Sequence, residues 1–481
     1  MSTYAFFDTV AAVATPFGKG GVAVIRLSGT DAAAVAARLF RPRSGRALTD
    51  YPARVVVWGD ILSPDEPGRV LDDGLCTLFP APHSFTGEDV AEISCHGGVL
   101  VTRSVLDACL RAGARQALPG EFTRRAFLNG RLSLDEAEAL GNLLEAGSDE
   151  QLRLSRAGMS GHLARETEAI YGALCPVLAN LEAGIDFPEE DLTELTPAEL
   201  AAAVAEAEGR VCRLLATYRT GHAIAEGIPT AICGAPNAGK SSLYNRLVGR
   251  DAAIVTAVAG TTRDVLSETV PLGRVTLRLS DTAGLRESAD EVERIGVSRA
   301  LAALEAAELV LWIADPTAPE EADADADGAA EAVAAAEASG KAVIRIRTRA
   351  DLLPHPLPTG DGWLYISTVT GEGMDALCEE VERLFIDGAL RTGEDAVVFS
   401  ARQAAALSDC ADALRRVAGS LAAGLTADIC AEDVRVALDA LGDVCGHNVR
   451  EDVISEIFSR LQWHHYSAKF PMLPYVAIRV P

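Results

Sequence analysis

One eight-residue segment constrains the fold of this chain more than any other. Residues 234–241 read Gly-Ala-Pro-Asn-Ala-Gly-Lys-Ser, which fits the pattern G-x-x-x-x-G-K-S/T. A β-rich run precedes the segment and a helical pattern follows it, as a phosphate-binding loop requires. In such a loop the backbone N–H groups surround the phosphates, Lys240 reaches the β- and γ-phosphate oxygens, and Ser241 offers its hydroxyl to Mg²⁺. The sequence therefore predicts a nucleotide-binding α/β domain.

The residues around this loop alternate between strand and helix patterns, which is typical of a parallel α/β domain. The expected strands are Thr230–Cys233, Val275–Ser280, Leu309–Ala314, Ala342–Arg347 and Trp363–Ile366. An Ala-, Asp- and Glu-rich stretch, Glu320–Gly340, is expected to form a surface helix with a polar lead-in.

Further motifs follow the loop in the order of a GTP-binding domain. The segment Asp281–Gly284 ends a strand, where an aspartate can hold the Mg²⁺ shell and a glycine lets the backbone approach a γ-phosphate. Asp351 can accept hydrogen bonds from N1–H and the 2-amino group of guanine, which favours GTP over ATP. The expected nucleotide contacts are Asn237, Ala238, Gly239, Lys240, Ser241, Ser242, Thr261, Thr262, Asp281, Thr282, Ala283, Gly284, Thr348, Arg349, Ala350, Asp351, Ser367, Thr368 and Val369.

The rest of the chain shows two kinds of sequence pattern, one α+β and one helical. The first 120 or so residues read as α+β, with β-rich runs at Val22–Leu27 and Arg54–Trp58. Helical patterns then begin at Ser133 and at Thr196, each of which has a glutamate three residues later and so predicts a capping box. Behind the second start, apolar residues recur at helical spacing: Leu200, Val204, Val211, Leu214 and Tyr218.

Helical patterns return at the C-terminal side of the α/β domain, over Arg402–Ala422 and Ala431–Leu441. The simplest arrangement is one helical domain that the α/β domain interrupts. A length of 481 residues agrees with about three domains, at roughly 100–200 residues each.

Composition excludes several classes of protein. The chain has 43 Lys+Arg against 69 Asp+Glu, a net charge of −26, which argues against binding nucleic acid or anionic membranes through bulk charge. An RNA partner held by a local basic patch stays possible. The ten cysteines are scattered without a CxxC pair, which argues against a zinc ribbon and fits a reducing cytoplasm. With no signal peptide and no run of about 20 uncharged apolar residues, we expect a cytoplasmic protein without a membrane partner.

Together these blocks resemble the tRNA-modification GTPase MnmE (TrmE) family over about residues 1–460. The matching blocks are Ala14–Pro16 with Gly18–Gly21, Ser84–Asp89, His96–Gly98, Pro119–Thr123, Arg125–Gly130, Ile185–Pro188, the phosphate loop, Gly260–Asp264 and Asp281–Glu287. The resemblance implies a multidomain α/β and α fold, in which a helical domain is interrupted by an inserted Ras-like P-loop G domain. It places an α+β folate-binding and dimerisation domain at 1–121, the helical domain at 122–224 and 388–481, and the G domain at 225–387.

The resemblance also implies an activity and partners. Such a homodimer works with the flavoprotein MnmG, as an expected heterotetramer, to add a carboxymethylaminomethyl group at C5 of uridine 34, the wobble uridine of certain tRNAs. A tetrahydrofolate derivative, in the 5-formyl or methylene form, supplies the one-carbon unit. By residue-wise comparison Arg26, Glu92 and Arg131 are the expected folate contacts, and the family more often has Lys where this chain has Arg131.

Leu285 stands where Ras-like proteins have the glutamine that orients water, so another group must assist GTP hydrolysis. The resemblance implies K⁺ in place of an arginine finger, Mg²⁺ at the phosphates, Glu293 as the residue that positions water, and Arg286 as support for the second switch. It adds Thr256 and Val258 to the nucleotide contacts. The implied K⁺ ligands are Asn237, Thr256, Val258 and Thr261, and the implied Mg²⁺ ligands are Ser241 and Thr262.

Two departures from the family pattern stand out. The guanine motif, usually Asn-Lys-x-Asp, reads Thr348-Arg349-Ala350-Asp351 here, which loses the amide that bonds the N7 edge of the base. The chain also lacks the family's C-terminal cysteine, because no cysteine follows Cys445 and the tail after Arg460 diverges.

Two alternatives remain open from the sequence: a regulatory or ribosome-assembly GTPase without modification activity, and a scaffold with an inactive nucleotide site. A folate site in the N-terminal third would favour the modification enzyme. Lys240, Ser241 and Asp281 argue against the inactive scaffold.

Overall fold

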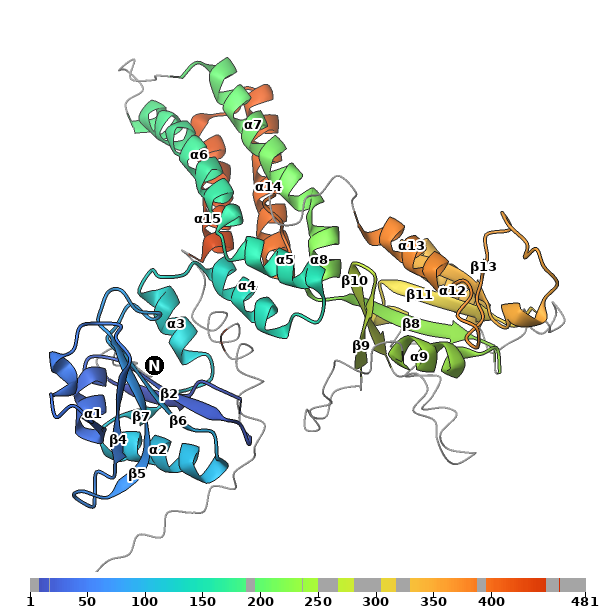
Figure 1. The fold of residues 1–481 in the computed structure, drawn as a ribbon. Coiled ribbons are helices and arrows are strands. Elements are labelled where there is room, and N and C mark those ends of the chain that lie inside the picture. Colours follow the sequence, from blue (N-terminus) through green and yellow to red (C-terminus); the bar gives the residue numbers. More distant parts are fainter. Residues whose placement is uncertain are drawn as a thin grey trace, which may run out of the picture. The chain divides into compact units, whose positions relative to one another are not determined.

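The structure is a computed structural model, shown in Figure 1. It describes residues 8–16, 18–186, 195–235, 237–249, 267–280, 304–316, 329–386, 395–446 and 458. Contacts divide the chain into two units, of which the first is Met1–Gly141 with Val449–Pro481 and the second is Asn142–Asn448. No helix in the described part of the chain is long and apolar enough to cross a bilayer.

The first unit is built on a seven-stranded sheet in the order β3-β4-β5-β6-β2-β1-β7. Its strands are β1 Val10–Val13, β2 Val22–Ser28, β3 Phe40–Pro42, β4 Val57–Leu62, β5 Val70–Phe79, β6 Val90–His96 and β7 Arg115–Gln116. Neighbouring strands run antiparallel, except that β7 is parallel to β1. Helices α1 Ala32–Leu39 and α2 Val99–Arg111 share one apolar core with the sheet.

The two faces of this sheet have different neighbours because side chains alternate along a strand. Ile25 of β2 points into the core with α1 and α2, whereas Arg26 points to the other face. On that other face Val10 and Ala12 of β1 pack with Phe122 of α3, Glu121–Leu128. The predicted strand Val22–Leu27 is thus confirmed, and it presents Arg26 on the α3 side.

The predicted run Arg54–Trp58 is only partly a strand. Strand β4 begins at Val57, and Val55 and Val56 are 41% and 59% exposed. Arg54 has a positive φ of 63° and donates its backbone N–H to the Leu78 carbonyl at 2.8 Å. This turn at Arg54 interrupts the extended backbone, so the β-rich composition of the run overstates the strand.

The second unit contains four long helices that pack into one core (Figure 1). They are α6 His162–Asp186, α7 Pro197–Ala216, α14 Ala401–Ala422 and α15 Ala427–Cys445, accompanied by the shorter α5 Asp149–Gly158 and α8 Tyr218–Ala225. Helix α4, Leu134–Glu145, begins in the first unit and ends in the second. Two of the long helices precede the α/β part of the chain and two follow it. One helical domain is therefore interrupted by the insert, as predicted.

Local sequence signals correctly predicted where two of these helices, α4 and α7, begin. The capping box at Thr196 is present, as is the reciprocal pair between Ser133 and Glu136. Four of the five spaced apolar residues behind Thr196 are buried, namely Leu200, Val204, Val211 and Leu214. The fifth, Tyr218, begins the next helix, α8, so the expected helix ends two residues earlier.

The insert is a six-stranded sheet in the order β13-β12-β11-β8-β10-β9. Its strands are β8 Ile228–Gly234, β9 Ser267–Leu272, β10 Val275–Ser280, β11 Leu309–Ala314, β12 Ala342–Arg347 and β13 Leu364–Tyr365, with helices α9 Lys240–Gly249, α12 Ala329–Ala338 and α13 Met374–Phe385. All five predicted strands are present and run parallel to one another. Strand β9, which pairs antiparallel with β10 at the edge, was not predicted.

Candidate functional site

The phosphate loop connects the end of β8 to the start of α9 and uses backbone that favours glycine. Gly234 has φ +142°, and a Cβ there would lie 2.0 Å from the carbonyl oxygen of Ile313 in β11. Gly239 has φ +104°, and Asn237 also has a positive φ, of 63°. Close contact with β11 therefore explains why the first glycine of the motif is needed here.

The lysine of the motif folds over its own loop. Its ammonium donates to the carbonyl oxygens of Gly234 at 2.7 Å and Ala235 at 2.8 Å. Ser241 and Ser242 are exposed in the first turn of α9, whose N-terminal N–H groups favour an anion. The Lys240 ammonium, the N-terminus of α9 and two hydroxyl groups thus lie together where the sequence predicts phosphate and Mg²⁺. The exposed Ser241 hydroxyl is a hard oxygen ligand, which suits Mg²⁺.

The second predicted group of contacts lies beside this loop. Thr348, at the end of β12, donates from Oγ1 to the carbonyl oxygen of Ala238 at 2.6 Å. Arg349 donates to the Asn237 carbonyl at 3.1 Å and to Asp315 at 2.6 Å. The structure therefore joins the phosphate loop directly to the predicted guanine motif, across about 110 residues of sequence.

The carboxylate predicted to read guanine is held in place from the next loop. Ser367, which is fully buried, donates from Oγ to Asp351 Oδ1 at 2.6 Å, while Asp351 itself is exposed. The neighbouring Thr368 is half-buried and Val369 is 77% exposed. A fixed, exposed carboxylate is suited to accept hydrogen bonds from a base edge.

The remaining nucleotide and ion residues lie outside the described residues. They are Thr256, Val258, Thr261, Thr262, Asp281, Thr282, Ala283, Gly284, Arg286 and Glu293. Of the implied K⁺ ligands the structure describes Asn237, which is exposed on the loop.

In the first unit the structure brings together two of the three predicted folate residues. Arg26 and Glu92 are cross-strand partners on β2 and β6, and they form an ion pair at 2.8 Å with each side chain 28% exposed. The Arg26 guanidinium lies 5.4 Å from the ring centre of Phe85 and 5.8 Å from that of Phe122. The guanidinium of this pair therefore lies near two aromatic rings on the α3 side of the sheet.

Arg131 approaches the same loop from the other end. A Cβ on Gly87, which has φ +78°, would lie 3.1 Å from Cγ of Arg131 and 3.1 Å from Cβ of Asn129. Since Gly87 and Phe85 belong to one loop, Arg26 and Arg131 both contact the block Ser84–Asp89.

A cavity of about 480 Å³ opens beside this loop. It is lined by Thr30, Ala81, Glu88, Asp89, Leu128 and Asn129. Its volume is in the range of small-molecule sites. None of the three predicted folate residues lines it, so the cavity and the Arg26–Glu92 pair are neighbouring features of one loop and not one lining.

Sequence reasoning missed a buried charge network on the same side of the sheet. Arg125 of α3, with a side chain 6% exposed, contacts the carboxylates of Asp8 at 2.6 Å, Glu121 at 2.8 Å and Glu88 at 3.0 Å. Arg115 also contacts Asp8 and Glu121, both at 2.7 Å. Two of the matching family blocks, Pro119–Thr123 and Arg125–Gly130, contain Glu121 and Arg125 and could have drawn attention to this network. Their spacing does not predict that Arg125 contacts Asp8 or Glu88.

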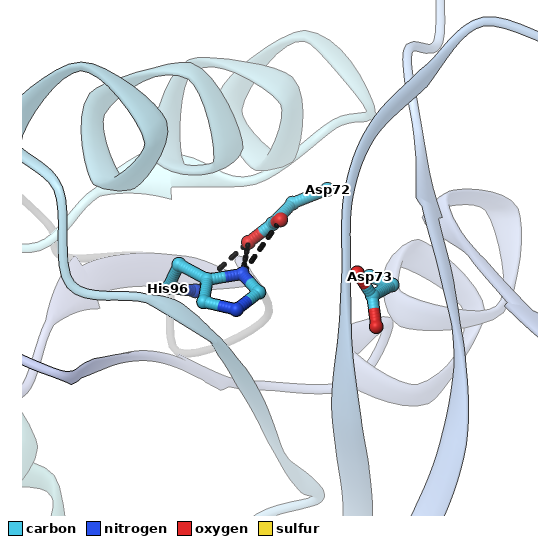
Figure 2. A group of neighbouring side chains, drawn as sticks. All are labelled: Asp72, Asp73 and His96. Carbon is cyan, nitrogen blue, oxygen red and sulfur yellow. Dashed lines mark hydrogen bonds and ion pairs between the residues drawn. The ribbon is translucent and has the colours of Figure 1, made fainter.

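One group in the described residues has the composition of a metal site. Asp72, Asp73 and His96 offer ligand atoms that lie within 4.8 Å of one another. Asp72, however, accepts from His96 Nδ1 at 2.9 Å and from the His96 backbone N–H at 2.8 Å, and its hydrogen bond raises the pKa of His96. Figure 2 draws no interaction between Asp73 and this pair, and Asp73 accepts from Trp58 Nε1 at 3.4 Å. An ion pair between Asp72 and His96 accounts for the group.

Neither of the last two cysteines of the chain is an exposed thiol. Cys430 is fully buried in the helical core, and burial raises the pKa of its thiol. Cys445 is half-buried, with its sulfur 2.9 Å from Thr167 Oγ1. Burial thus keeps both sulfur atoms from full exposure to solvent.

Comparisons with known proteins agree with this architecture. The model of the MnmE helical domain matches residues 134–461, and the model of the GTP-binding protein TrmE N-terminus matches residues 9–131. The tRNA modification GTPase MnmE of Symbiobacterium thermophilum is 44% identical over 463 residues, covering 94% of this chain and 98% of that protein. The protein of the same name from Moorella thermoacetica is 42% identical over 464 residues, with the same coverage of each chain.

Among solved structures, the G domain of the T. maritima FeoB iron transporter is 26% identical, with a TM-score of 0.23, and covers 32% of this chain and 96% of that domain. The two family models and the curated relatives together extend over nearly the full sequence. We conclude that the chain belongs to the tRNA modification GTPase MnmE family.

Proposed function

We propose that this GTPase acts with MnmG to add a carboxymethylaminomethyl group at C5 of the wobble uridine of tRNA, using a one-carbon unit from tetrahydrofolate. Membership of the family supports the proposal. The main structural support for GTP binding is the pair of hydrogen bonds between the phosphate loop and the Thr348–Asp351 segment. These bonds bring the expected phosphate and base contacts together from distant parts of the chain.

The chain's own residues divide the work of GTP binding. Lys240 exchanges its two loop carbonyls for phosphate oxygens, and Asp351 accepts from the guanine edge. Ser241 and Thr262 would hold Mg²⁺, and Asn237, Thr256, Val258 and Thr261 would hold K⁺. These ions supply positive charge against the charge that grows between the β- and γ-phosphates. Glu293 would position the attacking water, with Arg286 supporting the switch.

A comparison of GTP turnover in K⁺ and Na⁺ buffers tests the role assigned to the alkali ion. We expect faster turnover in K⁺, and we expect Asn237→Ala to remove the difference while nucleotide binding persists. Lys240→Ala is the negative control, since it removes the phosphate contact itself. Equal rates of the unaltered protein in the two buffers would contradict the K⁺ proposal.

The Arg26–Glu92 pair and the loop Ser84–Asp89 support a folate site in the first unit. A carboxylate such as Glu92 suits the donor edge of a pterin, and cationic groups such as Arg26 and Arg131 suit the glutamate tail. Calorimetry with 5-formyltetrahydrofolate tests this, with Arg26→Met expected to weaken binding at least tenfold. Arg103→Met, which removes an exposed arginine of the same unit, is the matched control.

A second copy of the chain is the proposed partner of exposed apolar residues on the α3 side of the sheet in the first unit. Trp58 and Leu75 are cross-strand neighbours there, 57% and 42% exposed, and Val22 is 62% exposed. Exposed apolar groups of this size favour association. Light scattering of Trp58→Asp, compared with the unaltered protein, should show loss of the dimer, and an unchanged dimer would refute this interface.

A rescue experiment in cells separates the modification proposal from the regulatory or ribosome-assembly alternative. Cells that lack this chain and are rescued with it should regain the modified wobble uridine, as measured by mass spectrometry of tRNA nucleosides. Normal GTP turnover without folate binding and without rescue would favour the alternative. The same outcome with normal folate binding would assign the fault to the divergent tail after Arg460.

A further inference from the structure

The hydroxyl of Thr348 is already committed to the phosphate loop. Thr348 is 2% exposed, and its Oγ1 donates to the carbonyl oxygen of Ala238 at 2.6 Å. Its backbone N–H donates to the Ala314 carbonyl at 3.1 Å, which fixes the residue at the end of the sheet. A Cβ on Gly239 would lie 3.0 Å from the same Oγ1, so the loop packs directly against this side chain.

The number of donor hydrogens limits the hydrogen bonds that the Thr348 side chain can form. A threonine hydroxyl has one hydrogen, whereas an asparagine amide has two. The one hydrogen of Thr348 serves the Ala238 carbonyl, so none is left to donate to an acceptor on a bound base. An asparagine at this position could serve the loop with one N–H and a base with the other.

Arg349 holds the preceding carbonyl of the same loop. It adopts a left-handed conformation with φ 55°, and its Nη2 donates to the Asn237 carbonyl at 3.1 Å. Its Nη1 contacts Asp315 at 2.6 Å, and the Asp315 side chain is 14% exposed. Two consecutive carbonyls, of Asn237 and Ala238, are therefore held by two consecutive side chains, and Asp315 orients the guanidinium.

We propose that Thr348 and Arg349 are positioning residues that tether the phosphate loop, and that neither reads the N7 edge of guanine in this chain. Base selection then falls to Asp351, which Ser367 orients. The inference rests on GTP binding at the proposed site. Holding the carbonyls outward keeps the loop N–H groups directed at the phosphates, so the tether acts through the loop and not through the base.

A nucleotide that lacks N7 tests the base part of the proposal. The full chain should bind 7-deaza-GTP and GTP with the same dissociation constant within about twofold, since no N7 contact is lost. Thr348→Asn should bind GTP about 3–10-fold more tightly than 7-deaza-GTP, because a neutral hydrogen bond is worth roughly 0.5–1.5 kcal/mol and 1.4 kcal/mol is tenfold. A fivefold or greater preference of the unaltered chain for GTP over 7-deaza-GTP would overturn the proposal.

Two further variants test the tether. Thr348→Val removes the hydroxyl at nearly the same volume and should weaken GTP and 7-deaza-GTP equally, by about 3–10-fold, because the loop and not the base is affected. Thr348→Ser keeps the hydroxyl and should restore the affinity. Equal affinities of Thr348→Val and the unaltered chain would overturn the tether. Failure of the unaltered chain to bind either nucleotide would overturn this inference together with the proposed site, whereas normal GTP binding with strong N7 dependence overturns the inference alone.

Discussion

Arg125 is a residue of the first unit whose loss should have a large and specific effect. Its guanidinium contacts three carboxylates, and its side chain is 6% exposed. Replacement by Met keeps much of the apolar volume and removes the charge. Asp8 and Glu121 would retain Arg115 as a partner. Among the described residues, the donor that remains to the Glu88 carboxylate is the Ser28 hydroxyl, at 2.7 Å.

The expected cost follows from this unequal loss. Breaking a buried ion pair typically costs 3–5 kcal/mol because a buried charge is left without its partner. Since two of the three carboxylates keep Arg115, we expect the lower end of that range, about 3 kcal/mol. The double variant Arg125→Met with Glu88→Gln removes the stranded charge and should recover about 1–2 kcal/mol of the loss.

Hydrogen exchange measured by mass spectrometry on peptides covering residues 115–128 is the suitable assay, because it reports local opening in a chain with several domains. A loss of about 3 kcal/mol corresponds to roughly 100-fold faster exchange. Arg103→Met is the matched control, since its ion pair with Asp107 is long, at 3.8 Å, and exposed. We expect the control to change exchange by about twofold at most.

The pH dependence provides an independent check. Burial alone would raise the pKa values of Asp8 and Glu121, but their contacts with arginine outweigh it and lower both values below 3.8 and 4.5. Carboxylates with lowered pKa stabilise the folded state above those values, and the stabilisation is lost as the pH falls through the folded pKa values. The unaltered chain should therefore lose more protection on acidification than Arg125→Met. Exchange in Arg125→Met that stays within about fivefold of the unaltered chain, or no recovery in the double variant, would refute the reasoning.

Three further predictions concern the second unit. Gly234→Ala should abolish nucleotide binding without unfolding the helical core, because its Cβ would lie 2.0 Å from the Ile313 carbonyl oxygen, and GTP titration with helical circular dichroism checks this. Thr196→Ala should cost about 1 kcal/mol of α7 stability, measured by urea denaturation, since it removes the capping box. The hydrogen bond with Glu308 raises the pKa of His222 above 6.5, so its stabilisation should be present below about pH 6.5 and lost as the pH rises through the folded value. His222→Phe should remove this pH dependence from thermal unfolding, and an unchanged profile would contradict it.

Local signals succeeded where the physical cause was itself local. The loop 234–241, the five strands of the insert and the caps at Ser133 and Thr196 depend on neighbouring residues, on alternation and on spacing, and each appears in the structure. The run Arg54–Trp58 failed because a turn at Arg54 overrides its β propensity. Strand β9 was missed because it is stabilised by pairing with β10 at the edge of the sheet. The sequence of one segment does not reveal such a pairing.

The sequence by itself determined the order of most elements, the phosphate loop and the kind of nucleotide it serves, because these follow from residue types at short, fixed spacings. The tertiary structure alone decided which distant groups meet: Arg125 with Asp8 across 117 positions, Arg26 with Glu92 across 66, and Thr348 with the loop across 110. Such pairings depend on sheet order and register, which no local pattern encodes. They also show that Thr348 and Arg349, which depart from the family pattern, are structurally occupied in holding the phosphate loop.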